Sequence, residues 1–279
     1  MTDTEMAILA LTGVCTIALA LPHLLPLHRV APQAAASVWL LTLALRALLS
    51  LAVVAAALLW IPHISALAPA LAVSCSVTLF CCVMVTMTLR LRRRLRDLAL
   101  GIGPEGSLVM ADRDVYVALT GVGPTRVLVS AGALDALDGA ELRASLAHEH
   151  GHHHLRHRVW ALAGAAFLAL ARPLPGGAAC QRGLALGLER HADEYAVRET
   201  GDPLALASAI CKAAQGRTPI GSLALARTGT AVRLDQLMSK APARSSSRVE
   251  RAAEALAGAL FTLTSSGALA LGSVLDTYA

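Results

Sequence analysis

The segment His148-Glu149-His150-Gly151-His152 contains the pattern His-Glu-x-x-His, whose residue types and spacing suit a metal ion. Residues four apart share one face of a helix, so His148 and His152 could direct both imidazoles at one ion. Glu149 would lie beside them, within reach of a water molecule at that ion, and could act as a general base. Because imidazole and carboxylate ligands suit zinc, the pattern predicts one catalytic Zn²⁺ per chain.

A catalytic zinc site needs a third protein ligand, and the segment Glu189-Arg-His-Ala-Asp193 offers one. We predict that Glu189 completes the site. Asp193, one helical turn later, is expected to accept a hydrogen bond from the distal N–H of a ligand histidine and so orient it. His191 and Tyr195 are near enough in sequence to stabilise an oxyanion, but neither is favoured, and the donor is left unassigned.

The segment 145–158 contains six histidines, more than a metal site would use. The four outside the pattern, His150, His153, His154 and His157, fall on other faces of the helix or further along it. We expect them on the helix surface, where they could add positive charge at acidic pH.

The elements that must position these side chains are recognisable from local signals. Asp138 and Glu141 form a capping-box pattern, which predicts a helix that begins near Gly139 and carries the histidines. The apolar residues 159–171 are too few for a membrane span, so we interpret them as a continuation of this helix, buried or lying against the membrane.

Further elements are expected on both sides of the histidine helix. A helix over about 183–200 should end at Gly201, and the next should begin at Asp202-Pro203, where Asp caps and Pro occupies the first turn. Two strand-like runs, 114–120 and 126–130, are joined by a Gly-Val-Gly-Pro turn.

The composition indicates a membrane protein, since 56% of the residues are hydrophobic and only 15% are charged. Four apolar runs are long enough to cross a hydrocarbon core of about 30 Å: 6–27, 34–61, 66–89 and 252–275. The predicted fold class is therefore mainly α and integral to the membrane, with a small α+β domain between the third and fourth spans. The expected domains are 1–97 (three membrane helices), 98–247 (the α+β domain) and 248–279 (the last membrane helix).

The arginines set the expected orientation. Five of them follow the third apolar run between residues 90 and 96, whereas neither the N-terminus nor the second loop carries a basic residue. By the positive-inside rule the N-terminus lies outside, the 98–247 domain in the cytoplasm and the C-terminus outside, in the cytoplasmic (inner) membrane. This clustering also argues against direct nucleic-acid binding. Arg46, within the second run, is either a structural arginine or part of a polar relay.

The stretches LVSAGALDALDGAELRASLAHEHGHH and ERHADEYAVRETGD resemble the gluzincin pattern of membrane metallopeptidases. The closest resemblance is to antibiotic-sensor transducers of the BlaR/MecR type, and HtpX-type membrane proteases are related. The resemblance implies three membrane helices, a cytoplasmic zincin-like (gluzincin) domain and a fourth helix. It implies His148, His152 and Glu189 as zinc ligands, Glu149 as the base and Asp193 as the supporting carboxylate.

The resemblance also implies an activity, endopeptidase cleavage of a protein held as an added strand along the segment 115–130. The transducers carry a penicillin-binding sensor domain after the last helix, and this chain has none, so direct β-lactam sensing is not expected. Three functions stay open: regulated proteolysis, for example of a transcriptional repressor; quality control of membrane proteins in the HtpX manner; and a non-catalytic zinc-containing receptor or scaffold. The expected partners are the bilayer and a protein substrate, and a homo-oligomer is compatible with the sequence.

Overall fold

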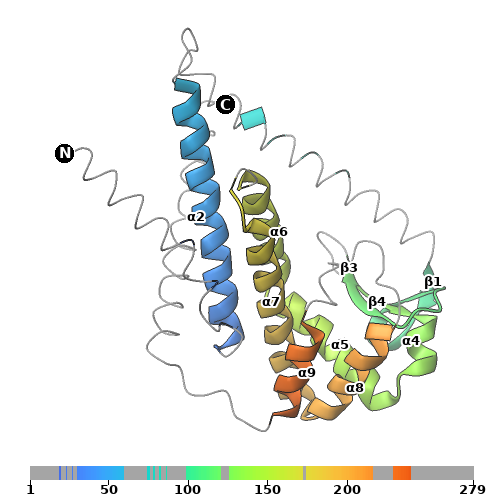
Figure 1. Cartoon of the computed structure of the whole chain (residues 1–279). Coiled ribbons are helices and arrows are strands. Elements are labelled where there is room, and N and C mark those ends of the chain that lie inside the picture. Colours follow the sequence, from blue (N-terminus) through green and yellow to red (C-terminus); the bar gives the residue numbers. More distant parts are fainter. Residues whose placement is uncertain are drawn as a thin grey trace.

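A computed structural model describes residues 30–59, 99–120, 126–171, 174–215 and 229–239, together with eight isolated positions between 19 and 86. Within these ranges the chain is mostly helical, with one small sheet (Figure 1). The helices are α2 (Pro32–Leu59), α4 (Ala131–Ala136), α5 (Gly139–His154), α6 (His157–Leu170), α7 (Gly177–Thr200), α8 (Pro203–Gln215) and α9 (Thr230–Met238). The strands are β1 (Ala99–Ile102), β2 (Leu108–Met110), β3 (Val117–Thr120) and β4 (Arg126–Ser130), with a 3-10 turn, η2, at Pro104–Gly106.

The sheet has the strand order β1-β2-β4-β3, so β1 and β3 are its edges. The strand predicted over 126–130 is confirmed as β4, whereas the one predicted over 114–120 begins only at Val117. β3 runs antiparallel to β4, with Val117 opposite Val129. β2 pairs parallel to β4, and β1 pairs antiparallel to β2; neither β1 nor β2 was predicted. Val127 and Val129 of β4 pack against Leu146 of α5, which attaches the sheet to the histidine helix.

α5 begins as predicted, with a capping box in which the Asp138 side chain accepts from the N–H groups of Ala140 and Glu141. The Glu141 carboxylate accepts from the Asp138 N–H in return, at 2.8 Å. The predicted continuation over 159–171 is wrong. α5 ends at His154, Arg156 adopts a left-handed backbone conformation (φ 54°), and α6 begins in a new direction at His157.

α7 begins at Gly177, six residues before the predicted start, and ends as expected before Gly201. The start of α8 is also confirmed, since Asp202 accepts from the Ala205 N–H at its N-terminus. α9 was not expected, because its nine residues lie within a polar stretch that we interpreted as partly unstructured.

α2 lies beside α6 and α7, and the sheet lies on the far side of α5 (Figure 1). Leu43 of α2, Ala161 of α6 and Leu184 of α7 form one buried cluster. Gly183 allows the close approach, since a Cβ there would lie 2.4 Å from the ring of Trp39. The three helices therefore pack as a bundle that joins the apolar N-terminal part of the chain to the histidine helix.

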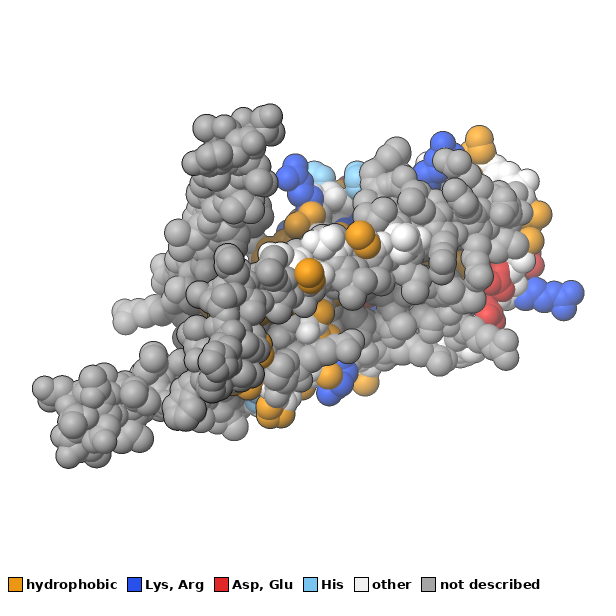
Figure 2. Space-filling model, turned by 90° about the horizontal axis from the view of Figure 1, so that it is seen from above, with side chains coloured by type: hydrophobic (Ala, Val, Ile, Leu, Met, Phe, Trp, Pro, Cys, Tyr) orange, Lys and Arg blue, Asp and Glu red, His pale blue; other side chains and the backbone are white. Residues whose placement is uncertain are grey.

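The second predicted span corresponds to α2, of which Pro32–Val54 is long and apolar enough to cross a membrane. Large apolar side chains on α2 (Leu48 and Val53) and on α6 (Val159 and Leu162) are exposed. Seen from above, the visible acidic side chains of the described residues lie at the sheet end, away from α2 and α6 (Figure 2). The helical segments predicted over 6–27, 66–89 and 252–275 lie wholly or almost wholly outside the described residues.

Arg46 in α2 is buried, with 6% of its surface exposed. Its guanidinium donates to the carbonyl oxygen of Pro175, in the turn between α6 and α7, and to that of Leu19. These contacts link α2 to the α6–α7 turn, as the structural interpretation of Arg46 expects, and the same guanidinium lies 3.3 Å from His23 Nε2.

Candidate metal centre

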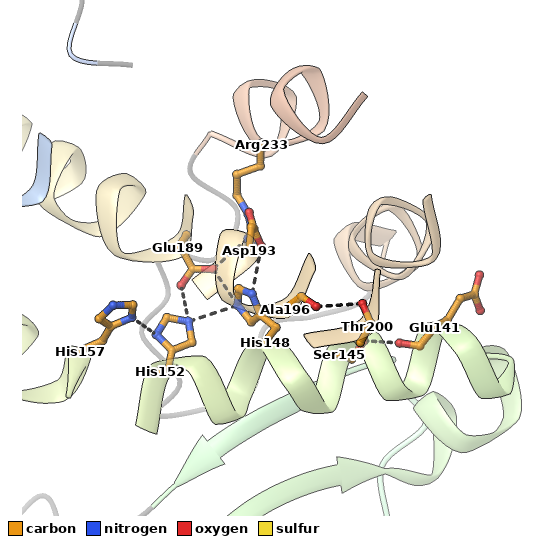
Figure 3. Close-up of polar contacts among 10 residues, drawn as sticks. All are labelled: Glu141, Ser145, His148, His152, His157, Glu189, Asp193, Ala196, Thr200 and Arg233. Carbon is orange, nitrogen blue, oxygen red and sulfur yellow. Dashed lines mark hydrogen bonds and ion pairs between the residues drawn. The ribbon is translucent and has the colours of Figure 1, made fainter. Parts of the chain in front are cut away.

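Three predicted ligand side chains meet where α5 passes α7 (Figure 3). The Nε2 atoms of His148 and His152 lie 3.1 Å apart. His148 Nε2 lies 3.5 Å from Oε2 of Glu189, and His152 Nε2 lies 3.4 Å from Oε1 of the same carboxylate. A tetrahedral zinc site with metal–ligand bonds of about 2.0–2.1 Å places its ligand atoms about 3.3 Å from one another. The three donors therefore fit a zinc ion without rearrangement of the backbone.

The spacing of the ligands explains why they converge. His148 and His152 stand one turn apart on α5, and Glu189 and Asp193 stand one turn apart on the facing side of α7. Asp193 Oδ1 lies 3.0 Å from His148 Nδ1, although the ring N–H is not aligned with the oxygen as in a good hydrogen bond. The carboxylate thus lies where the sequence places it, behind the first ligand histidine.

Gly151 lies on α5 between the two ligand histidines, where the helix passes closest to α7. A Cβ at this position would lie 3.1 Å from Cδ1 of Tyr195. The glycine therefore permits the short separation between the two helices that carry the ligands.

Arg233 of α9 is part of the site and was missed by the sequence reasoning. It is 4% exposed and forms two 2.7 Å hydrogen bonds to the two carboxylate oxygens of Asp193. A third hydrogen bond, of 2.8 Å, reaches Glu189 Oε2. No local pattern identifies Arg233 as a partner of these carboxylates, since it lies 40 residues beyond Asp193 in the sequence.

The negative charges of Glu189 and Asp193 are compensated by Arg233 and the nearby histidines. Burial alone would raise the pKa values of Glu189 and Asp193, but the Arg233 guanidinium and the nearby histidines lower both. Burial would lower the pKa of His148, but the carboxylates of Asp193 and Glu189 raise it to about 10. Both carboxylates are therefore ionised at neutral pH, which is the form that a metal ion binds.

Glu149, the predicted base, contacts the sheet through its carboxylate. Its Oε2 atom accepts a 2.7 Å hydrogen bond from the backbone N–H of Leu119 in β3. β3 is an edge strand, so the candidate base is attached to the strand that was expected to bind an extended peptide.

The prediction that His157 lies on the surface is wrong. The side chain is buried, with 3% of the residue exposed, and its Nδ1 atom lies 3.0 Å from Nδ1 of His152. Its Nε2 atom lies 3.2 Å from Nδ1 of His191. Burial lowers the pKa of His157 to about 2, so the imidazole is neutral. The break at Arg156 redirects the chain and turns His157 inward, which helical spacing alone could not predict.

The other three histidines outside the pattern are surface residues, as expected. His150 is half-exposed and lies 3.8 Å from a carboxylate oxygen of Glu105, and His153 and His154 are exposed. Tyr195, one of the two residues considered for the oxyanion, packs against the ring of His154. The other, His191, faces His157.

The model of peptidase family M48 matches residues 86–262, more than half of the chain. The chain belongs to peptidase family M48. The match includes both the histidine helix and α7, and it extends beyond the predicted 98–247 domain at each end. No curated protein and no solved structure matches the chain.

Membership of this family supports a metallopeptidase, since M48 peptidases are metal-dependent and typically use zinc. Among the residues that the structure describes, His148, His152 and Glu189 form the one group of three or more His, Cys, Asp or Glu side chains arranged to hold a metal ion. Family and geometry therefore agree on the class of chemistry.

Proposed function

We propose that this chain is a membrane-bound, zinc-dependent endopeptidase that cleaves a cytoplasmic or membrane-proximal protein. The single observation that carries the proposal is the convergence of His148, His152 and Glu189, with donor separations of 3.1–3.5 Å that match a tetrahedral zinc site. Zinc held by these residues would supply Lewis-acid activation of water and of the scissile carbonyl.

The proton transfers are assigned to Glu149. Because its Oε2 atom accepts the Leu119 N–H, the other oxygen, Oε1, is available to take a proton from the attacking water. The same oxygen would then deliver the proton to the nitrogen of the departing amine. Asp193 orients His148 in this scheme, and Arg233 fixes both α7 carboxylates so that neither rotates away.

The substrate is proposed to lie along β3 as an added strand, because β3 is an edge strand adjacent to α5. A membrane location is supported by α2, which is long enough to span, and by the exposed apolar side chains of α6 packed beside it. With the arginines of 90–96 on the cytoplasmic side, the site would face the cytoplasm in the inner membrane.

Regulated cleavage, for example of a transcriptional repressor in the manner of the BlaR/MecR transducers, is the preferred biological role. HtpX-like quality control predicts a broad set of substrates instead. A comparison of protein abundance between cells that carry the wild type and cells that carry Glu149→Gln distinguishes the two, since regulated proteolysis changes few proteins and quality control changes many.

The decisive test of the activity uses the purified full chain in detergent, loaded with zinc, and an unfolded protein such as casein. The wild type is expected to cleave it, and Glu149→Gln is expected to lose at least about 10²-fold in rate while it retains one zinc per chain. Equal rates in the two proteins would contradict the proposed mechanism. A wild type that binds zinc but cleaves nothing, casein or cellular protein, would favour the receptor or scaffold.

A further inference from the structure

His157 and His191 lie behind the candidate metal centre and are not used by the mechanism above. We propose that His157 is a positioning residue, which holds the ligand His152 in the tautomer and ring orientation needed for metal binding, and that His191 supports His157 from behind. This inference rests on the proposed zinc site and concerns the residues around it.

The geometry is that of a chain of three imidazoles. His152 Nδ1 lies 3.0 Å from His157 Nδ1, and His157 Nε2 lies 3.2 Å from His191 Nδ1. The rings of His152 and His157 meet edge to face, at 80° and a centroid distance of 4.9 Å. His157 is the first residue of α6, and it is buried behind the ligand (Figure 3).

The tautomers of the three histidines follow from the nitrogen that His152 presents to the metal position. His152 presents Nε2 to the metal position, so this nitrogen needs a free lone pair and the proton must reside on Nδ1. That N–H donates to His157 Nδ1, which therefore accepts and carries its own proton on Nε2. His157 Nε2–H then donates to His191 Nδ1. His191 thus fixes the tautomer of His157, and His157 fixes that of His152.

The two ligand histidines are thus supported by different chemistry. The Nδ1 atom of His148 faces the Asp193 carboxylate, whereas the Nδ1 atom of His152 faces the imidazole of His157. Glu189 and Asp193 already place two negative charges in the cluster, and Arg233 is the buried guanidinium that contacts both. A third carboxylate behind His152 would lack such a partner, and an unpaired buried charge is costly. An imidazole accepts the same hydrogen bond without adding charge.

Substitutions at His157 can separate the two hydrogen bonds. In His157→Asn the amide oxygen can take about the position of Nδ1, so the contact with His152 is kept and that with His191 is lost. In His157→Gln the polar group reaches about the position of Nε2, so the contact with His191 is kept and that with His152 is lost. His157→Leu loses both. His154→Asn, at an exposed position on the preceding turn, is the matched control.

The affinity for zinc is measured by competition with a chromophoric chelator, and the visible absorption of the Co²⁺-substituted protein reports ligand geometry. We expect His157→Asn and His154→Asn to bind zinc within about threefold of the wild type, whereas His157→Gln and His157→Leu bind about 10–100-fold more weakly with an altered Co²⁺ spectrum. The comparison of Asn with Gln decides the question even if His157→Leu does not fold, since both substitutions place a neutral amide of similar polarity in the same space.

Equal affinities and spectra for His157→Asn and His157→Gln would overturn the inference, because a merely structural role would not discriminate between them. The proposed function fails separately: it fails if the wild type itself binds no zinc. A wild type that binds zinc, together with His157 variants that do not differ from one another, would refute only the positioning role.

Discussion

Glu149 and Leu119, thirty residues apart, are joined by a 2.7 Å hydrogen bond from the Leu119 backbone N–H to Oε2 of the Glu149 carboxylate. Leu119 lies in the edge strand β3, and this N–H is not part of the ladder to β4. The candidate base is therefore attached to the strand along which an extended substrate is proposed to lie. The proposed substrate position and the position of the candidate base therefore involve the same segment of backbone.

This contact predicts that Glu149 has a structural role as well as a catalytic one. Glu149→Gln should leave the free energy of unfolding nearly unchanged, because the amide oxygen can still accept the Leu119 N–H. Glu149→Leu leaves that N–H without its partner and should lower the free energy of unfolding by about 1–3 kcal/mol. For a chain of this size, each kcal/mol corresponds to a fall of about 2–4 °C in the thermal midpoint. Thermal unfolding of both zinc-loaded variants in detergent measures the difference. Identical midpoints would show that the contact contributes nothing to stability.

Arg233 gives a second prediction, which concerns the charge balance of the metal-free site. Arg233→Met removes the guanidinium that pairs with Asp193 and Glu189, and breaking such a buried pair costs about 3–5 kcal/mol. Bound zinc would offset part of this loss by neutralising the same carboxylates. The destabilisation should therefore be larger without zinc than with it, as measured by thermal unfolding in the presence of chelator or of zinc.

The matched control is Arg143→Met, at an exposed position on α5, which should change the midpoint little under either condition. If Arg233→Met lost the same stability with and without zinc, its role would be packing rather than compensation of the two carboxylates.

The predictable part of this molecule is the part that is encoded locally. The capping box of Asp138 and Glu141 determines where α5 begins, and the four-residue spacing then places His148 and His152 on one face. The short strand β3 and the start of α8 were also recognisable from their own residues. Each of these features depends on interactions between residues that are close in sequence.

The parts that were missed depend on contacts that are distant in sequence. Arg233 pairs with carboxylates 40 and 44 residues away, and nothing in the sequence of α9 marks it as a partner. His157 was assigned to the surface because helical spacing was extended through Arg156, whose left-handed conformation ends that spacing. A single residue in this conformation is uncommon for a side chain other than glycine and could not be expected from composition.

Glu141 gives a prediction of pH dependence away from the metal. Burial alone would raise its pKa, but hydrogen bonds from Lys212, Ser208 and the Asp138 N–H lower it from 4.5 to about 2. Because the pKa of the folded state is the lower one, the ionised carboxylate stabilises the fold above about 4.5, and this contribution is lost as the pH falls toward 2. The difference in stability between the wild type and Glu141→Gln should be full at pH 7 and should shrink across that range.

Thermal midpoints of the two proteins between pH 7 and pH 2 test this expectation, with Glu105→Gln as the control at an exposed position of η2. Loss of zinc at low pH affects the wild type and the Glu141→Gln variant alike, so it cancels in their difference. A difference that stayed constant down to pH 2 would contradict the assigned role of the Glu141 carboxylate.

Arg46 gives the last prediction, which concerns the packing of α6 and α7 on α2. A backbone carbonyl that is shielded from water needs a hydrogen-bond partner within the protein, and Arg46 provides one for Pro175. Arg46→Leu leaves that carbonyl unpaired, which should weaken the packing of α6 and α7 on α2 by about 1–3 kcal/mol. Since α7 carries Glu189, limited proteolysis of the α6–α7 segment and the zinc affinity should both change, whereas Leu48→Ala, at an exposed position of α2, should change neither. Faster proteolysis with unchanged zinc affinity would show that the N-terminal part of α7 can separate from α2 without disturbing Glu189.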